Sequence, residues 1–272
     1  MPPDSPAVSA QQPPVVLVEH DEGVATITLH RPEAMNALNL AAKQQLLAAL
    51  EQAAEDPAVR CVVLIGSGRA FCVGQDLKEH VEQLHSGDQL GDTVLDHYNP
   101  IALLLATMNK PVLAALNGVA AGAGASMALA TDLRFLADTA GINTAFAGIA
   151  LSCDTGSSWT LPRLVGTARA KELLLMPRTV PADECLSLGL ATEVVPAADL
   201  ADRVREVART LAAGPTLAYG SIRRAVAYAA AHPMQEALDH EAHLMTLTGQ
   251  SADHLAAVDA FLAKQKPTFT GR

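Results

Sequence analysis

Aromatic residues are scarce in this 272-residue sequence. Phe, Tyr and Trp make up 3% of the chain, although half of its residues are apolar. A sizeable core is therefore possible, but it must be built from Ala, Val and Leu. The length suits one main domain with an appendage rather than two large domains.

The sequence also lacks a basic run, and its formal net charge is −10 at pH 7. Such a chain repels polyanions and anionic membranes, so we expect neither a nucleic-acid nor a membrane partner. The negative net charge does not exclude a small anionic ligand, because helix N-termini can bind one. Residues 112–130 form the longest apolar stretch, but Asn117 and three glycines interrupt it, which favours a buried strand, loop and helix over a membrane span.

The four cysteines form no C-x-x-C pair and have no metal-like spacing with histidine. We interpret them as reduced, mostly buried thiols and expect no metal site. A basic secretory n-region is also missing, and we therefore expect a cytoplasmic protein.

Hydrophobic patterning divides the chain into three parts. Residues 1–13 are rich in Pro, Ala, Ser and Gln and are expected to be a disordered leader. Strand and helix patterns alternate through residues 14–198, beginning with a hairpin over residues 15–30 and a helix capped by Asn39. The remainder, residues 199–272, is mostly of helical periodicity. We predict an α/β core followed by a helical C-terminal unit.

Three segments could carry chemistry. Residues 68–77 (GRAFCVGQDL) place a glycine turn between a strand and a helix, and residues 117–126 (NGVAAGAGAS) are mostly Gly and Ala at a helix start. Both can expose backbone N–H groups to an oxygen, although ordinary connections and close packing explain them too. In residues 151–159 (LSCDTGSSW), Asp154 is either a helix N-cap or a catalytic group. His80 is interpreted as a solvated side chain.

Together these segments resemble the crotonase (enoyl-CoA hydratase/isomerase) superfamily. The resemblance extends from about residue 15 to 196 and includes residues 31–38 (RPEAMNAL), 70–77 (AFCVGQDL), 132–134 (DLR) and 161–166 (LPRLVG). It implies a spiral of β-β-α units with a helical C-terminal trimerisation unit, in a homotrimer or a dimer of trimers. The implied ligand is an acyl-CoA thioester. Coenzyme A is then part of the substrate, and no separate cofactor is implied.

The resemblance also assigns roles to residues. The backbone N–H groups of Val73 and Ala123 would form an oxyanion hole for the thioester enolate. Contacts with coenzyme A or the acyl group are implied for Met35, Ala37, Leu38, Gln75, Asp76, Leu77, Asn99, Gly122 and Phe146.

The sequence departs from the family's hydratases at both of their glutamates. Ser126 and Phe146 occupy those positions, and neither transfers a proton as a carboxylate does. Asp154 is the remaining family-matched acid or base, and together with residues 98–100 (YNP) it resembles the ring-isomerase branch of phenylacetate degradation. The 4-chlorobenzoyl-CoA dehalogenases also carry an aspartate here, with a histidine where this chain has Asn99.

We therefore expect isomerisation of a double bond or ring in an unsaturated acyl-CoA, with Asp154 moving the proton. The enzymatic alternatives are hydration by an unidentified acid–base pair, and dehalogenation or thioester hydrolysis by Asp154. A non-catalytic protein that binds CoA esters is the fourth hypothesis.

Overall fold

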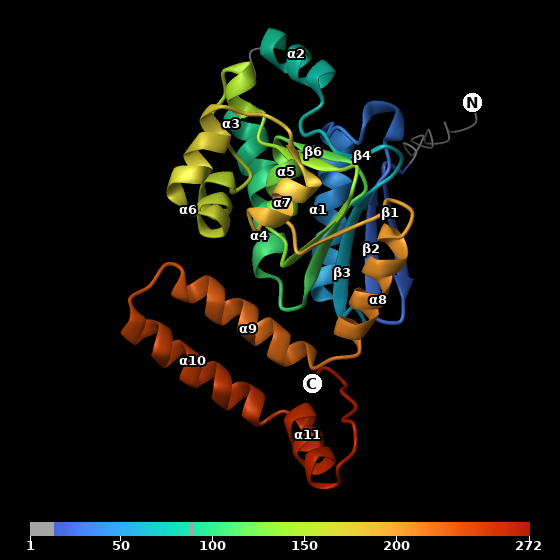
Figure 1. Ribbon diagram of the computed structural model, residues 1–272, viewed down its shortest axis with the longest axis vertical. Helices are drawn as coiled ribbons and strands as arrows, with labels where there is room; N and C mark the ends of the chain where they lie inside the picture. The colour runs from blue at the N-terminus through green and yellow to red at the C-terminus, as the bar shows by residue number, and fades with distance from the viewer. Residues whose placement is uncertain (1–13, 87–89) are drawn as a thin grey trace, which may run out of the picture.

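The strands of the protein form two sheets in the computed structural model, which describes residues 14–86 and 90–272 (Figure 1). The predicted leader, residues 1–13, lies outside the described residues. One sheet has the order β1-β2-β3-β5-β7-β10, and the other has the order β4-β6-β8-β9. The strands are β1 (Val16–Asp21), β2 (Val24–Leu29), β3 (Cys61–Gly66), β4 (Ala70–Cys72), β5 (Val112–Leu116), β6 (Val119–Ala121), β7 (Leu133–Ala137), β8 (Gly141–Asn143), β9 (Val180–Pro181) and β10 (Glu193–Val195).

Successive turns of the chain add one strand to each sheet. β3, β5 and β7 extend the first sheet, and β4, β6 and β8 follow them directly into the second. The strands of successive turns pair in parallel, whereas β1 pairs with β2, and β8 with β9, antiparallel. This is the spiral of β-β-α units that the sequence predicted.

Helices complete the turns of this spiral. The first begins after Asn39, whose side chain accepts a hydrogen bond from the Ala42 N–H at 3.0 Å, as its cap preference predicted. The helices are α1 (Leu40–Glu55), α2 (Leu77–Ser86), α3 (Leu90–Thr93), α4 (Asn99–Thr107), α5 (Ala123–Leu129), α6 (Ser157–Leu175), α7 (Ala182–Ser187), α8 (Leu200–Ala212), α9 (Thr216–Ala229), α10 (Met234–Gly249) and α11 (Ala252–Leu262). Three short helical turns are η1 (Pro32–Ala34), η2 (Val94–Tyr98) and η3 (Phe146–Ile149).

The last four helices differ in how they are buried. α8 packs against the six-stranded sheet and buries Leu200 and Val204, whereas α9 and α10 form an antiparallel hairpin that extends from the body with α11 (Figure 1). Large apolar side chains on this extension stay exposed, among them Met245 at 73% and Phe261 at 80%. Among the described residues, no helix is long and apolar enough to cross a membrane.

Small residues let the loop after β4 and the start of α5 touch backbone to backbone. A Cβ at Gly124 would overlap the carbonyl of Cys72. Gly74 has a φ of 85°, and a Cβ there would lie 3.0 Å from the Ala121 oxygen and 3.2 Å from the Ala123 nitrogen. The Gly- and Ala-rich segment is therefore required for close packing, and that packing places two candidate N–H donors side by side.

We expect Gly124→Ala to lower the free energy of unfolding by about 1–3 kcal/mol, because the added methyl group forces α5 away from β4. Urea denaturation measures the change. Gly249→Ala at the end of α10 is the matched control, since a Cβ there meets nothing within 4 Å and alanine favours a helix. Equal stability of Gly124→Ala and the parent would contradict the close contact.

Candidate active site

The two predicted oxyanion donors lie on adjacent chain segments. Val73 follows β4, and Ala123 begins α5 next to the parallel strand β6. Gly122 precedes Ala123 with φ 52° and ψ −126°, and its own N–H donates to the Asn143 carbonyl at 3.0 Å. Within residues 14–86 and 90–272, neither the Val73 nor the Ala123 N–H donates a hydrogen bond. Both amides are therefore available to an external oxygen.

Asp154 lines a cavity of about 460 Å³. Most of the cavity wall is apolar, and the side chains of Gln75, His80 and Tyr98 add polar groups to it. Burial raises the pKa of Asp154, while a hydrogen bond from the Thr155 hydroxyl to Oδ1, at 2.7 Å, acts in the opposite direction and only partly offsets it. A carboxyl group in this environment is a stronger base than an exposed aspartate.

The N-cap alternative for Asp154 is wrong. α6 begins at Ser157, its N-cap residue is Gly156, and no side chain caps it. Asp154 contributes only its backbone carbonyl, which accepts from the Ser157 N–H at 3.0 Å. The carboxylate is therefore free of the capping function that local sequence suggested.

The positions that match the hydratase glutamates are buried and carry no carboxylate. The Ser126 hydroxyl lies 3.0 Å from the Gly122 carbonyl, to which it donates, and 2.5 Å from the Ser157 hydroxyl. Phe146 is 8% exposed and lies in η3. Neither residue can therefore supply the paired acid and base that hydration by two glutamates needs.

A buried lysine on α1, which was not predicted as a site residue, binds two side chains that line the cavity, Gln75 and Thr93. The Lys43 ammonium is fully buried and donates to Gln75 Oε1 at 3.3 Å, Glu79 Oε1 at 2.9 Å and Thr93 Oγ1 at 2.8 Å. The Tyr98 hydroxyl donates to the same Gln75 oxygen at 2.5 Å, and burial raises the pKa of Tyr98. The signal was present, because Lys43 shares a helical face with the buried residues Leu46 and Leu50.

Asp76 is part of a structural ion pair. Arg31 Nη1 donates to Asp76 Oδ2 at 2.8 Å and to the Ala37 carbonyl at 2.5 Å. Burial raises the pKa of Asp76, but the hydrogen bond and charge of Arg31 and the Lys78 amide outweigh it and lower the pKa. The pair holds the segment before α1 against the loop after β4.

The structure separates the predicted ligand contacts into two groups. Gln75 and Leu77 line the cavity with Asp154. Leu38 is fully buried, and its N–H and carbonyl bind the Gly74 oxygen and the Asp76 N–H, so it fixes the loop that carries Val73. The predicted contacts outside the cavity lining are Met35, Ala37, Leu38, Asp76, Asn99, Gly122 and Phe146.

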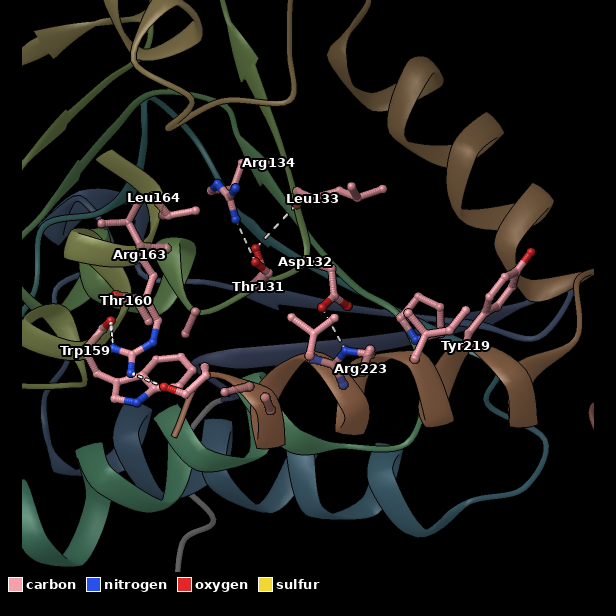
Figure 2. Close-up of a pocket in the computed structure, with 18 of the residues that line it drawn as sticks. Thr131, Asp132, Leu133, Arg134, Trp159, Thr160, Arg163, Leu164, Tyr219 and Arg223 are labelled. Carbon is pink, nitrogen blue, oxygen red and sulfur yellow. Dashed lines mark hydrogen bonds and ion pairs between the residues drawn. The ribbon is translucent and has the colours of Figure 1, made fainter. Parts of the chain in front are cut away.

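A second, larger cavity of about 540 Å³ lies between α9 and the body of the molecule (Figure 2). Its charged side chains are already held by protein groups: Arg223 pairs with Asp132 at 2.8 Å, and Arg134 donates to the Thr131 carbonyl at 2.7 Å. Asp154 is not among its lining residues, whereas it lines the smaller cavity. The smaller cavity is therefore the candidate active site.

Comparison with known proteins identifies the family. A model of the enoyl-CoA hydratase/isomerase family matches residues 19–272. The chain belongs to this family. The predicted crotonase-type fold and family are thereby confirmed, and the protein is an enzyme of the crotonase superfamily.

Members of this enoyl-CoA hydratase/isomerase family resemble the chain over nearly its whole length. It is 41% identical to the 1,2-epoxyphenylacetyl-CoA isomerase of Escherichia coli K12, over 94% of this chain and 98% of the relative. It is 43% identical to a probable enoyl-CoA hydratase of Rhodobacter capsulatus, over 93% and 97%. A crystal structure from Mycobacterium abscessus, assigned to enoyl-CoA hydratase/isomerases, superposes with a TM-score of 0.90 at 44% identity, covering 94% of this chain and 100% of the other.

We expect Asp154→Asn to raise the melting temperature at pH 7. A carboxyl whose pKa is raised on folding favours the folded state only while it is protonated, and its ionised form costs stability. Asparagine removes the charge and keeps an oxygen for the Thr155 hydroxyl. The gain should vanish below about pH 4, where the carboxyl is protonated in both states.

Differential scanning calorimetry across this pH range measures the effect. Asp96→Asn on η2, at an exposed position, is the control and should leave the melting temperature unchanged. A lower melting temperature for Asp154→Asn at pH 7 would show that the carboxylate stabilises the fold after all.

Proposed function

We propose that this enzyme isomerises an unsaturated acyl-CoA thioester, with Asp154 as the proton-transfer group. The observation that carries the proposal is the environment of Asp154: its carboxylate lies in a mostly apolar cavity, caps no helix and has a raised pKa. Perturbed carboxyl groups in cavities are typical of acid–base catalysts.

The proposed reaction begins with removal of a proton from the carbon beside the thioester carbonyl. Asp154 accepts this proton, and the electron pair moves onto the thioester oxygen as an enolate. The N–H groups of Val73 and Ala123 then donate to that oxygen, and each such donor contributes roughly 3–4 kcal/mol to the transition state. Reprotonation at a more distant carbon gives the isomer.

Two observations bear on the alternatives. Hydration is the second candidate, because a relative of similar identity is described as a probable enoyl-CoA hydratase. It needs a group that activates water, and Ser126 and Phe146 do not provide one. Dehalogenation has less support, because Asn99 is a neutral amide at the position where those enzymes have a histidine base.

We also propose that the predicted ligand contacts outside the cavity, apart from the fully buried Leu38, bind the coenzyme A part of the substrate. The acyl group would occupy the cavity beside Gln75 and Leu77. Met35, Ala37 and Asp76 would then belong to the surface along which the nucleotide end lies.

For the assembled state we propose a homotrimer or a dimer of trimers. Ile222 and Val226 border the second cavity on α9 and are 59% and 66% exposed, and the α10–α11 extension adds further apolar surface. An apolar surface of this kind favours burial against another copy of the chain. We place the protein in the cytoplasm, since the four cysteines are free in the described structure, as suits a reducing compartment.

The decisive experiment compares the parent and Asp154→Asn on straight-chain and ring-containing unsaturated acyl-CoA thioesters, with the products resolved by mass. Isomerisation conserves mass, hydration adds water, and hydrolysis releases free coenzyme A. We expect the parent to give isomers, and Asp154→Asn to lower kcat at least about a hundredfold, in the range of a lost general base, with little change in acyl-CoA binding. Near-normal turnover by Asp154→Asn would remove Asp154 from the mechanism.

Ala123→Pro tests the oxyanion donor. Proline removes the N–H and is compatible with the first position of a helix, so we expect the variant to fold and lose turnover by roughly a hundredfold or more. Ala123→Gly keeps the N–H and should remain active. Circular dichroism checks the fold, and full activity of a folded Ala123→Pro would exclude this amide as a donor.

A further inference from the structure

The Asp154 cavity is also lined by a histidine that takes no part in the proposed proton transfer by Asp154. His80 lies on the first turns of α2 and lines the cavity together with Asp154. The side chain is half-buried, and its Nδ1 atom is buried without a hydrogen-bond partner among the described residues. The expectation that His80 is a solvated residue does not describe this position.

The Nδ1 atom is closed to solvent and therefore to a ligand, and leaving such an atom without a hydrogen bond costs about 1–3 kcal/mol. The rest of this half-buried residue lines the cavity, where a ligand can meet it. Histidine is also the side chain whose ordinary pKa best suits proton transfer near neutral pH.

The other ionisable groups around the cavity are already engaged. Glu79 accepts from Lys43, and Tyr98 donates to Gln75 while burial raises its pKa. Asp76, just before α2, is paired with Arg31. Cys153 adjoins Asp154 in the chain and lines the same cavity, but a thiol is a poor match for protonating carbon at neutral pH. His80 is therefore the group best able to complement Asp154.

We propose that His80 is the second proton-transfer residue of this enzyme and works as the acid while Asp154 works as the base. This inference rests on the proposed isomerisation. Asp154 takes a proton from C2 of a 3-enoyl-CoA, the C–H bond breaks, and its electron pair forms the enolate. An N–H bond on the cavity side of the His80 imidazolium then breaks, and its proton adds to C4 as the enolate electrons return to form the C2–C3 double bond.

The step balances without any further reactant. One proton leaves carbon for Asp154, one leaves His80 for carbon, and exchange with water restores both side chains. The two-residue route differs from a one-residue route in the origin of the hydrogen at C4. With Asp154 alone, the hydrogen removed from C2 can return at C4; with His80, the hydrogen at C4 comes from solvent.

The test uses 3-enoyl-CoA thioesters that carry deuterium at C2, in ordinary water, with the parent, His80→Gln and His80→Asn. Mass spectrometry and NMR of the 2-enoyl-CoA product locate the deuterium. We expect the parent to place almost none at C4. Both His80 variants should lose kcat by about a hundredfold with KM little changed, and their residual product should carry more deuterium at C4.

His85→Gln is the matched control, because His85 lies on the same helix, is exposed, and bonds the Val81 carbonyl. It should keep the parent's kcat, KM and label pattern. Circular dichroism and melting curves establish that each variant is folded, and the glutamine and asparagine variants give two independent chances of a folded protein.

The outcomes separate this inference from the proposed function. A parent that does not isomerise any of these thioesters would overturn both. An isomerase that Asp154→Asn inactivates, but that keeps parental kcat in folded His80 variants, would overturn the role of His80 alone. A loss of kcat with an unchanged label pattern would also overturn it, because His80 would then hold the substrate or the wall without donating the proton.

Discussion

The contact between the loop after β4 and the first turn of α5 is the constraint on which the site depends. Two amides can converge on one oxygen only if their backbones come within a few ångströms, and side chains between them would prevent it. Gly74 and Gly124 remove those side chains at the two points of closest approach. Because the proposed donors are backbone groups, the side chains of Val73 and Ala123 are free to vary in size only within the space left by this contact.

The segment that carries Asp154 has local backbone strain. Ala145, Ala150 and Thr155 all have positive φ values, between 52° and 60°, in the segment that carries Asp154. Non-glycine residues in this conformation cost about 1–3 kcal/mol each, and the buried carboxylate adds a further electrostatic cost. The interleaved sheets must offset these costs, since strained residues persist only where the surrounding structure determines their conformation. The destabilising features are therefore concentrated in the segment that carries the proposed proton-transfer residue.

The sequence predicted helix starts and caps correctly where a single local residue preference determines them. Asn39 was identified as a cap, and the glycine-rich segment as the start of a helix, because their chemistry acts within a few residues. Asp154 was ambiguous for the same reason: Asp before Gly and Ser has the composition of a cap, but the positive φ of Gly156 moves the helix start beyond its reach. The partners of Lys43, and the wall on which His80 lies, come from segments far apart in the chain. No periodicity within one helix could reveal them.

Replacement of the hydratase glutamates has a structural consequence as well as a chemical one. Ser126 lies one turn after Ala123 on α5, and Ser157 lies at the start of the helix that follows Asp154. Their 2.5 Å hydrogen bond therefore links the helix of the proposed oxyanion donor to the segment of the proposed proton-transfer residue. The Ser157 N–H also binds the Asp154 carbonyl, so the connection continues to Asp154 itself. Where the family resemblance places a carboxylate on α5, this chain has a buried hydrogen bond that connects the helix of Ala123 to the segment of Asp154. A fixed connection of this kind suits the proposed isomerisation, because that reaction adds no water molecule to the substrate and none has to be positioned there.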